Sequence, residues 1–195
     1  AAKKVGFTKF DIFNLGVPDK IRENVDLKTI RTPFIPSGED NLFPQFLAEV
    51  ARQSPTHRSI LAQKKILSMG KNFASENLAV EEFIADVNTG DSMREVYGRI
   101  INDYYTFGNA YMQIVRHEGG INLFHIDATK CRISKDQKHI YIHPDWAKYG
   151  TTKEDTAIVP VYPDFEKNTS IVQFKDYEPT FNYYGLPDFV AAMSW

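Results

Sequence analysis

Cysteine, excess positive charge and long apolar runs are scarce in this sequence of 195 residues. Its single cysteine, Cys131, excludes an internal disulfide and a thiolate-rich zinc or iron–sulfur site, and it favours a reducing compartment. With 23 Lys and Arg against 25 Asp and Glu, the net charge of −2 excludes indiscriminate coating of DNA, which needs a basic excess. No stretch approaches the ~18 apolar residues of a membrane-spanning helix, and the first residues lack a signal-peptide core. We therefore expect a soluble protein without a membrane partner.

The common motifs of enzyme active sites are missing as well. GxSxG, HExxH, the phosphate-binding GxxxxGK[ST] and GxGxxG do not occur. Cys131 lies between polar turns, where a small buried strand residue is a better interpretation than a nucleophile. His139 and His143 would share one face of a helix, but the residues between them predict a strand, which would separate them by ~13 Å. We expect no catalytic residue, no metal and no cofactor.

What the sequence does contain is a globular composition, with 43% hydrophobic, 25% charged and 13% aromatic residues. Residues 1–40 are predicted to form an extended arm, because Pro33 and Pro36 deny the backbone the donors of a helix or central strand. Apolar residues at three-to-four spacing then predict four helices. They run from Asp40 or Asn41 to about Gln53, from Pro55 (capped by Ser54) to Gly70, from Ser75 to Asn88, and from Ser92 to about Tyr105. The third is expected to bury a stripe made of Leu78, Phe83, Ile84 and Val87.

After Asn109 the apolar period changes to two, which predicts strands. The expected strands are 110–116 and 121–126 in a hairpin around HEGG, 131–134 and 139–143 around KDQK, and then 158–162 and 171–174. A last helix should begin near Pro187. The predicted fold class is α+β, with N-terminal helices followed by a small antiparallel β region. We therefore expect two parts: an N-terminal arm of residues 1–40 and an α+β domain of residues 41–195.

Charges of opposite sign are segregated along two neighbouring helices. The stretch from Arg52 to Lys71 contains cations and no acid, whereas Glu76 to Glu95 contains six acids and only Arg94 as a cation. One interpretation is that adjoining helices pair these charges on a solvated face. The other is a pair of complementary edges through which copies join head to tail in a ring. The candidate interface residues are Arg58, Lys64, Lys65, Glu81 and Glu82.

Aromatic residues cluster in two places and allow a second kind of hypothesis. They are Tyr104, Tyr105, Phe107 and Tyr111, and later Tyr177, Phe181, Tyr183 and Tyr184. A non-catalytic module could use them to stack on single-stranded nucleic acid. No Lys or Arg lies between Asp103 and Tyr111, which favours core packing or a subunit contact. A hydrolase assembled from scattered carboxylates is a further rival, without a motif to support it.

The order of several segments resembles the portal proteins of tailed bacteriophages. These segments are SPTHRSILAQKKILSMGKNF, DYYTFGNAYMQIVR, IDATKCRI, IVQFKDYEP and YYGLPDFVAAM, and the similarity runs from about Asn41 to Trp195. The resemblance implies that Ser54-Pro55 begins a helix beneath the wing of the subunit. It implies that Gly108-Asn109 turns a helix into a strand, and that Gly185 and Pro187 begin a helix leading to the central part of the subunit.

The resemblance also implies a function. The whole protein would form a dodecameric ring at one capsid vertex of the virion, through which double-stranded DNA is packaged and ejected. It would bind terminase, the capsid and a head–tail connector, and it would be made in the cytoplasm of the host bacterium. The residues present here would form the wing-side portion, with the stem, clip and crown mostly downstream of Trp195.

Overall fold

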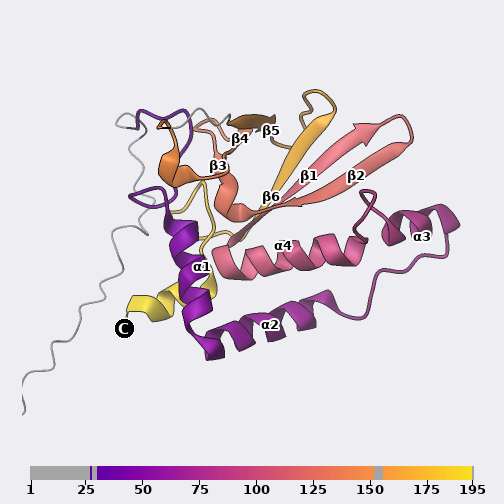
Figure 1. Ribbon diagram of the computed structural model, residues 1–195, viewed down its shortest axis with the longest axis horizontal. Helices are drawn as coiled ribbons and strands as arrows, with labels where there is room; N and C mark the ends of the chain where they lie inside the picture. The colour runs from indigo at the N-terminus through magenta and orange to yellow at the C-terminus, as the bar shows by residue number, and fades with distance from the viewer. Residues whose placement is uncertain (1–26, 28–29, 152–155, 195) are drawn as a thin grey trace, which may run out of the picture.

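The computed structural model describes residues 27, 30–151 and 156–194 (Figure 1). Four helices come first: α1 (Phe43–Gln53), α2 (Pro55–Met69), α3 (Leu78–Ala85) and α4 (Met93–Phe107). Six strands follow: β1 (Asn109–His117), β2 (Gly120–Ile126), β3 (Cys131–Ile133), β4 (His139–Ile142), β5 (Ala157–Pro160) and β6 (Thr169–Lys175). Short 3-10 helices are η2 (Ala128–Lys130), η3 (Trp146–Lys148) and η4 (Asp188–Ser194). The predicted α+β class is confirmed.

Capping side chains set the beginnings of most helices. The predicted start of α2 is confirmed, because the Ser54 hydroxyl accepts from the His57 N–H at 3.2 Å and Pro55 is the first helical residue. Ser92 and Glu95 form a capping box at the start of α4. For α1 the prediction of Asp40 or Asn41 as cap is wrong. Leu42 is the capping position, and no side chain bonds the first turn.

Helix α3 is shorter than the predicted span of Ser75 to Asn88. It ends at Ala85 because the Asp86 carboxylate accepts from the N–H groups of Asn88 and Gly90 and closes a turn instead. The expected buried stripe is also wrong in part. Val87 is buried, but it lies in the turn, and Leu78 is 73% exposed. No residue of α3 is fully buried.

The strands form two three-stranded antiparallel sheets, ordered β2-β1-β6 and β3-β4-β5. The predicted hairpin between β1 and β2 is confirmed: Tyr111 faces Ile126, His117 faces Gly120, and Gly120 takes a positive φ of 145°. A parallel bridge between Val161 and Ile171 joins the two sheets.

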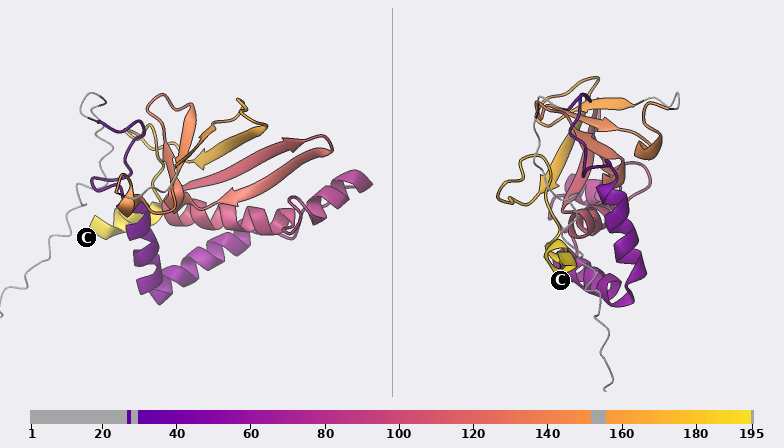
Figure 2. Two further views of the ribbon diagram at one scale, coloured as in Figure 1. Left: turned by 45° about the horizontal axis from the view of Figure 1, so that its top comes forward. Right: turned by 90° about the vertical axis from the view of Figure 1, so that its left-hand side faces the viewer.

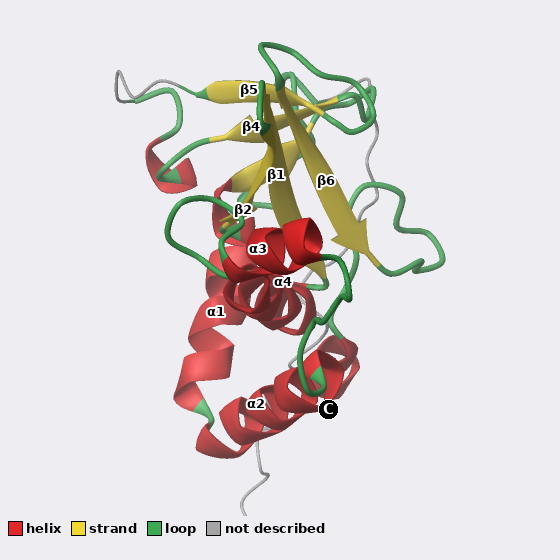
Figure 3. Cartoon of the chain, turned by 90° about the vertical axis from the view of Figure 1, so that its right-hand side faces the viewer, coloured by secondary structure: helices red, strands yellow, loops and turns green. Residues whose placement is uncertain are grey.

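The elements are stacked in layers. One face of the β2-β1-β6 sheet packs on α4, and α2 lies on the other side of α4 (Figures 1 and 3). Val96 and Ile100 of α4 meet Ala110 and Leu123 of the sheet in one apolar cluster. A larger cluster lies between α1, both sheets and the C-terminal segment (Figure 2).

The described end of the predicted arm contains bends, a turn and one isolated bridge between Phe34 and Ser134, and it packs into this larger cluster through Ile35. Phe34 and Ile35 are buried, and the Ile35 N–H donates to the Ile133 carbonyl at 2.8 Å. Residues 1–26 lie outside the described residues, so the division of the chain at residue 40 stays a prediction.

The last predicted helix begins where expected, at Asp188, but it is the 3-10 helix η4. Within the part of the chain that the structure describes, no helix has both the length and the hydrophobicity needed to span a bilayer.

Candidate assembly surfaces

Two turns that the sequence marked separately meet in the structure. Gly108 ends α4 with a φ of 68°, and Asn109 begins β1. The Asn109 side-chain oxygen accepts from the Gly185 N–H at 2.9 Å, and its amide nitrogen donates to the Gly185 carbonyl at 2.9 Å. A Cβ at either glycine would lie closer than 3.0 Å to main-chain atoms of the facing turn. The turns predicted at Gly108-Asn109 and at Gly185-Pro187 therefore contact each other and form one junction. The sequence analysis did not predict this contact.

The C-terminal side of this junction also binds the arm. The Tyr184 hydroxyl donates to the Ile35 carbonyl at 2.6 Å and accepts from the Ile133 N–H at 3.2 Å. From β6, the Gln173 amide donates to Asn109 and to the Tyr183 carbonyl. The junction thus fixes the path of residues 183–187 against α4, both sheets and the arm.

Helix α2 has an apolar surface that nothing covers within the described residues. None of its residues is fully buried, and Ile60, Ile66 and Leu67 are 52%, 68% and 79% exposed. Its contacts with α4 lie along one side, where the hydroxyls of Ser68 and Tyr105 are 2.7 Å apart. A helix that exposes several large apolar residues commonly packs against a further partner in an assembly.

The candidate interface cations on α2 differ from one another in their surroundings. Lys64 is engaged within the chain: its ammonium lies 2.5 Å from the Asp188 carboxylate and 5.2 Å from the centre of the Tyr105 ring. Arg58 and Lys65 instead line a cavity and form no ion pair with any described residue.

That cavity has a volume of about 790 Å³ and lies between α1, α2, α4 and residues 125–129. Four cations line it: Arg52, Arg58, Lys65 and Arg99. Its acids are bonded within the chain. Asp103 accepts from the Ala128 N–H at 3.1 Å and lies 2.8 Å from His125 Nε2, while Asp127 accepts from the Thr129 N–H. With these acids already paired, Arg58 and Lys65 leave positive charge uncompensated in the cavity.

The candidate acids Glu81 and Glu82 lie on α3, at the end of the molecule opposite α1 (Figure 1). Glu81 accepts a hydrogen bond from the Ser75 N–H, and Glu82 is exposed. Among the described residues no ion pair joins α2 to α3. The interpretation in which these adjoining helices pair their charges is therefore wrong for the described part of the chain.

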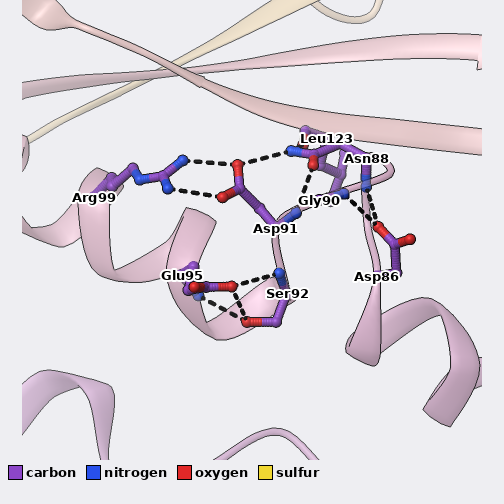
Figure 4. Close-up of polar contacts among 8 residues, drawn as sticks. All are labelled: Asp86, Asn88, Gly90, Asp91, Ser92, Glu95, Arg99 and Leu123. Carbon is purple, nitrogen blue, oxygen red and sulfur yellow. Dashed lines mark hydrogen bonds and ion pairs between the residues drawn. The ribbon is translucent and has the colours of Figure 1, made fainter.

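A polar turn fixes α3 to the rest of the fold (Figure 4). The Asn88 amide donates to the Leu123 carbonyl of β2 at 2.8 Å, and its oxygen accepts from the Asp91 N–H at 2.9 Å. The Asp91 carboxylate binds both terminal nitrogens of Arg99 at 2.7 Å. These bonds from Arg99 and Asn88 lower the pKa of Asp91, and bonds from the main chain and hydroxyl of Ser92 lower the pKa of Glu95.

A buried arginine is the strongest polar feature that sequence reasoning missed. Arg132 donates to the side chain and carbonyl of Asn41 at 2.5 and 2.6 Å and to the Cys131 carbonyl at 2.6 Å. Its guanidinium lies over the Trp146 ring, with 4.9 Å to the centroid. Because it is buried among neutral acceptors, its pKa is lowered. It ties the beginning of α1 to β3.

Cys131 and His143, which were weighed for catalysis or metal binding, are both buried in the fold. Cys131 begins β3 and is buried as interpreted, and burial raises the pKa of its thiol. His143 accepts from the Asp145 N–H at 3.1 Å and packs against Trp146. Residues 27, 30–151 and 156–194 contain no cluster of three His, Cys, Asp or Glu side chains suited to a metal ion.

Half of the eight aromatic residues weighed for stacking on nucleic acid are buried. Phe107, Tyr111, Tyr183 and Tyr184 are buried, whereas Tyr177 is 88% exposed. The buried rings contribute to the core and cannot stack on bases without unfolding it.

Chains of similar fold occur in solved structures of gene transfer agent particles. One belongs to the neck of an empty GTA particle computed with C6 symmetry, with a TM-score of 0.58, 15% identity, and coverage of 77% of this chain and 42% of that chain. Another belongs to the virion of a native gene transfer agent particle, with a TM-score of 0.59, 16% identity, and coverage of 77% and 41%. A third, from the neck of a native GTA particle computed with C12 symmetry, has a TM-score of 0.58, 16% identity, and coverage of 76% and 40%.

The chain therefore shares its fold with particle neck chains and spans less than half of their length. No protein-family model matches the sequence. No curated protein is similar to it in sequence.

Proposed function

We propose that this chain is a structural, non-catalytic subunit of the neck of a phage-like virion, and specifically the wing-side portion of a portal protein. The observation that supports this most is the fold, which is similar over 77% of the chain to a chain of a GTA particle neck. The order of sequence segments that resembles portal proteins supports the same conclusion independently. In this proposal the whole protein is a dodecameric ring through which double-stranded DNA enters and leaves the capsid.

The surfaces of the fold support a role in assembly. A closed ring of identical subunits needs two different, complementary surfaces on each copy. Helix α2 provides cations and α3 provides acids, and in the described part of the chain no ion pair joins the two helices. Of the candidate interface residues, Arg58, Lys65, Glu81 and Glu82 remain in the proposal. Lys64 contributes to it less, since it binds Asp188.

The charge balance is compatible with DNA movement through a ring. A channel that DNA slides through should avoid fixed clamps on the phosphates, and the 195 residues of this wing-side portion, with net charge −2, add no basic excess to the ring. Terminase, the capsid and a head–tail connector would bind other parts of the assembled ring.

Labelling of purified particles tests the location. Virions that carry an epitope tag on this protein should bind gold-labelled antibody at one vertex, next to the tail, in electron micrographs. A control tag on the major capsid protein should label the whole surface. Label spread over the capsid, or present only outside particles, would contradict the proposal.

A further inference from the structure

The cationic cavity combines positive charge with small side chains. From α2, Arg58, Leu61, Ala62 and Lys65 line it at positions i, i+3, i+4 and i+7, which form one face of a helix. From α1, Ala48, Ala51 and Arg52 line it at i, i+3 and i+4. The three alanines leave room between the cations. A bound water occupies about 30 Å³, so a cavity of about 790 Å³ is far larger than a single small anion requires.

The outer face of α3, formed by Leu78, Ala79 and Glu82, has the complementary properties. Leu78 and Glu82 lie one turn apart on the same side of the helix, and all three residues are exposed. Glu76 and Asp86 add negative charge just before and after the helix, and no Lys or Arg lies in α3. With eight residues, α3 is about 12 Å long. It is a short acidic helix with an apolar residue facing outward.

The positions of these two features exclude a contact between them within one copy. The cavity lies where α1 and α2 meet α4, and α3 lies beyond the opposite end of α4 (Figures 1 and 2). The α3 of one chain therefore cannot enter its own cavity. The polar turn around Asn88 and Asp91 holds α3 on β2 and α4, so that its outer face is presented as a fixed surface.

We propose that the outer face of α3 docks into the cationic cavity of a second copy of this chain. Leu78 packs against Leu61 and Ala62, and Glu82 pairs with Arg58 and Lys65. The contact is heterologous, since each copy offers α3 at one end and the cavity at the other, and such contacts close into rings when their rotation permits. The inference rests on the proposed function and names the surfaces that build its ring.

Cross-linking in the full-length protein tests the contact. The variant Leu78→Cys with Ala62→Cys should form a ladder of covalently linked copies under oxidising conditions, whereas either substitution alone should not. The natural Cys131 is buried and its thiol pKa is raised, so it should not contribute to the ladder.

Charge reversal gives a second measurement that does not depend on the cysteines. Lys65→Glu and Glu82→Lys should each lower the assembled fraction at a fixed subunit concentration by about tenfold. Combining them should restore assembly. Lys71→Glu changes an exposed cation beyond the end of α2, outside the cavity lining, and should assemble normally.

The outcomes separate the inference from the function. Rings without the ladder, or with assembly unaffected by Lys65→Glu, would overturn the docking and leave the proposed function in place. Absence of any oligomer in the unmodified full-length protein would overturn both.

Discussion

The side-chain amide of Asn109 is hydrogen-bonded to both the N–H and the carbonyl of Gly185, a residue 76 positions later in the chain. This contact joins the end of α4 to the beginning of the C-terminal segment. The Asn109 side chain thereby supplies hydrogen-bond partners for the buried N–H and carbonyl of Gly185. The direction in which the chain continues after residue 185 is therefore set by α4 and the sheet.

Asn109→Ala should lower the free energy of unfolding by about 2–3 kcal/mol, because it leaves the buried N–H and carbonyl of Gly185 without partners. Urea denaturation followed by circular dichroism measures this. Asn102→Ala removes an amide from the exposed side of α4 and should change stability by less than about 0.5 kcal/mol. Equal losses in the two variants would show that the Asn109 contact adds nothing.

Gly108→Ala should destabilise the chain by about 2–4 kcal/mol, since the added Cβ would overlap the main chain of Leu186 and Gly108 has a positive φ. The matched control is Gly90→Ala, where no atom lies within 4 Å of the added Cβ. There the smaller entropy of the unfolded chain should leave stability unchanged or slightly raised. A tolerated Gly108→Ala, with melting temperature equal to that of the control, would refute the close approach.

Local features of this fold could be predicted from the sequence. Ser54-Pro55 set the start of α2, and HEGG marked the place of the β1–β2 hairpin, because both depend on neighbouring residues alone. Long-range contacts could not be predicted in this way. Asn109 and Gly185 each carried a turn signal, but nothing in a single sequence states that two turns touch.

The difference between local features and long-range contacts also explains which predictions at the candidate surfaces were missed or wrong. The apolar spacing of α3 predicted a buried stripe, yet Leu78 faces outward, since spacing identifies an apolar face without saying whether its partner lies in the same chain. Arg132 gave no signal because arginine in a short strand is usually exposed, and its acceptors on Asn41 come from 91 residues away. The charge segregation was visible, but only the structure shows that Lys64 binds Asp188 and that Lys65 forms no ion pair among the residues the structure describes.

Arg132→Lys should lower the free energy of unfolding by about 2–4 kcal/mol. A lysine ammonium cannot reproduce the planar set of donors that reaches Asn41 and Cys131, and it would leave buried acceptors unpaired. Because Asn41 would lose its anchor, protease cleavage near residues 38–42 should also become faster. Arg31→Lys, at an exposed position, serves as the control for both measurements. Unchanged cleavage together with unchanged stability would contradict the anchoring role.

Stability should fall with acidification through the carboxyls at the start of α4. The pKa of Asp91 and that of Glu95 are lowered in the folded chain from ordinary values of 3.8 and 4.5. A lowered folded pKa contributes stability that is fully present above the unfolded pKa and is lost as the pH falls through the folded pKa. Unfolding measured from about pH 5 to about pH 3 should therefore show a shallower decline for Glu95→Gln or Asp91→Asn than for the unmodified chain. If the stability curves of the variants and the unmodified chain were parallel, these carboxyls would be excluded as the source of the acid-induced loss of stability.

The central claim is that this fold is built to be assembled around an axis. The most direct test is the mass of the full-length protein in solution. Native mass spectrometry of the purified polypeptide should detect a discrete closed species, with twelve copies as the proposed number, that persists on dilution. A species of one copy at every concentration tested, up to the solubility limit, would contradict the account.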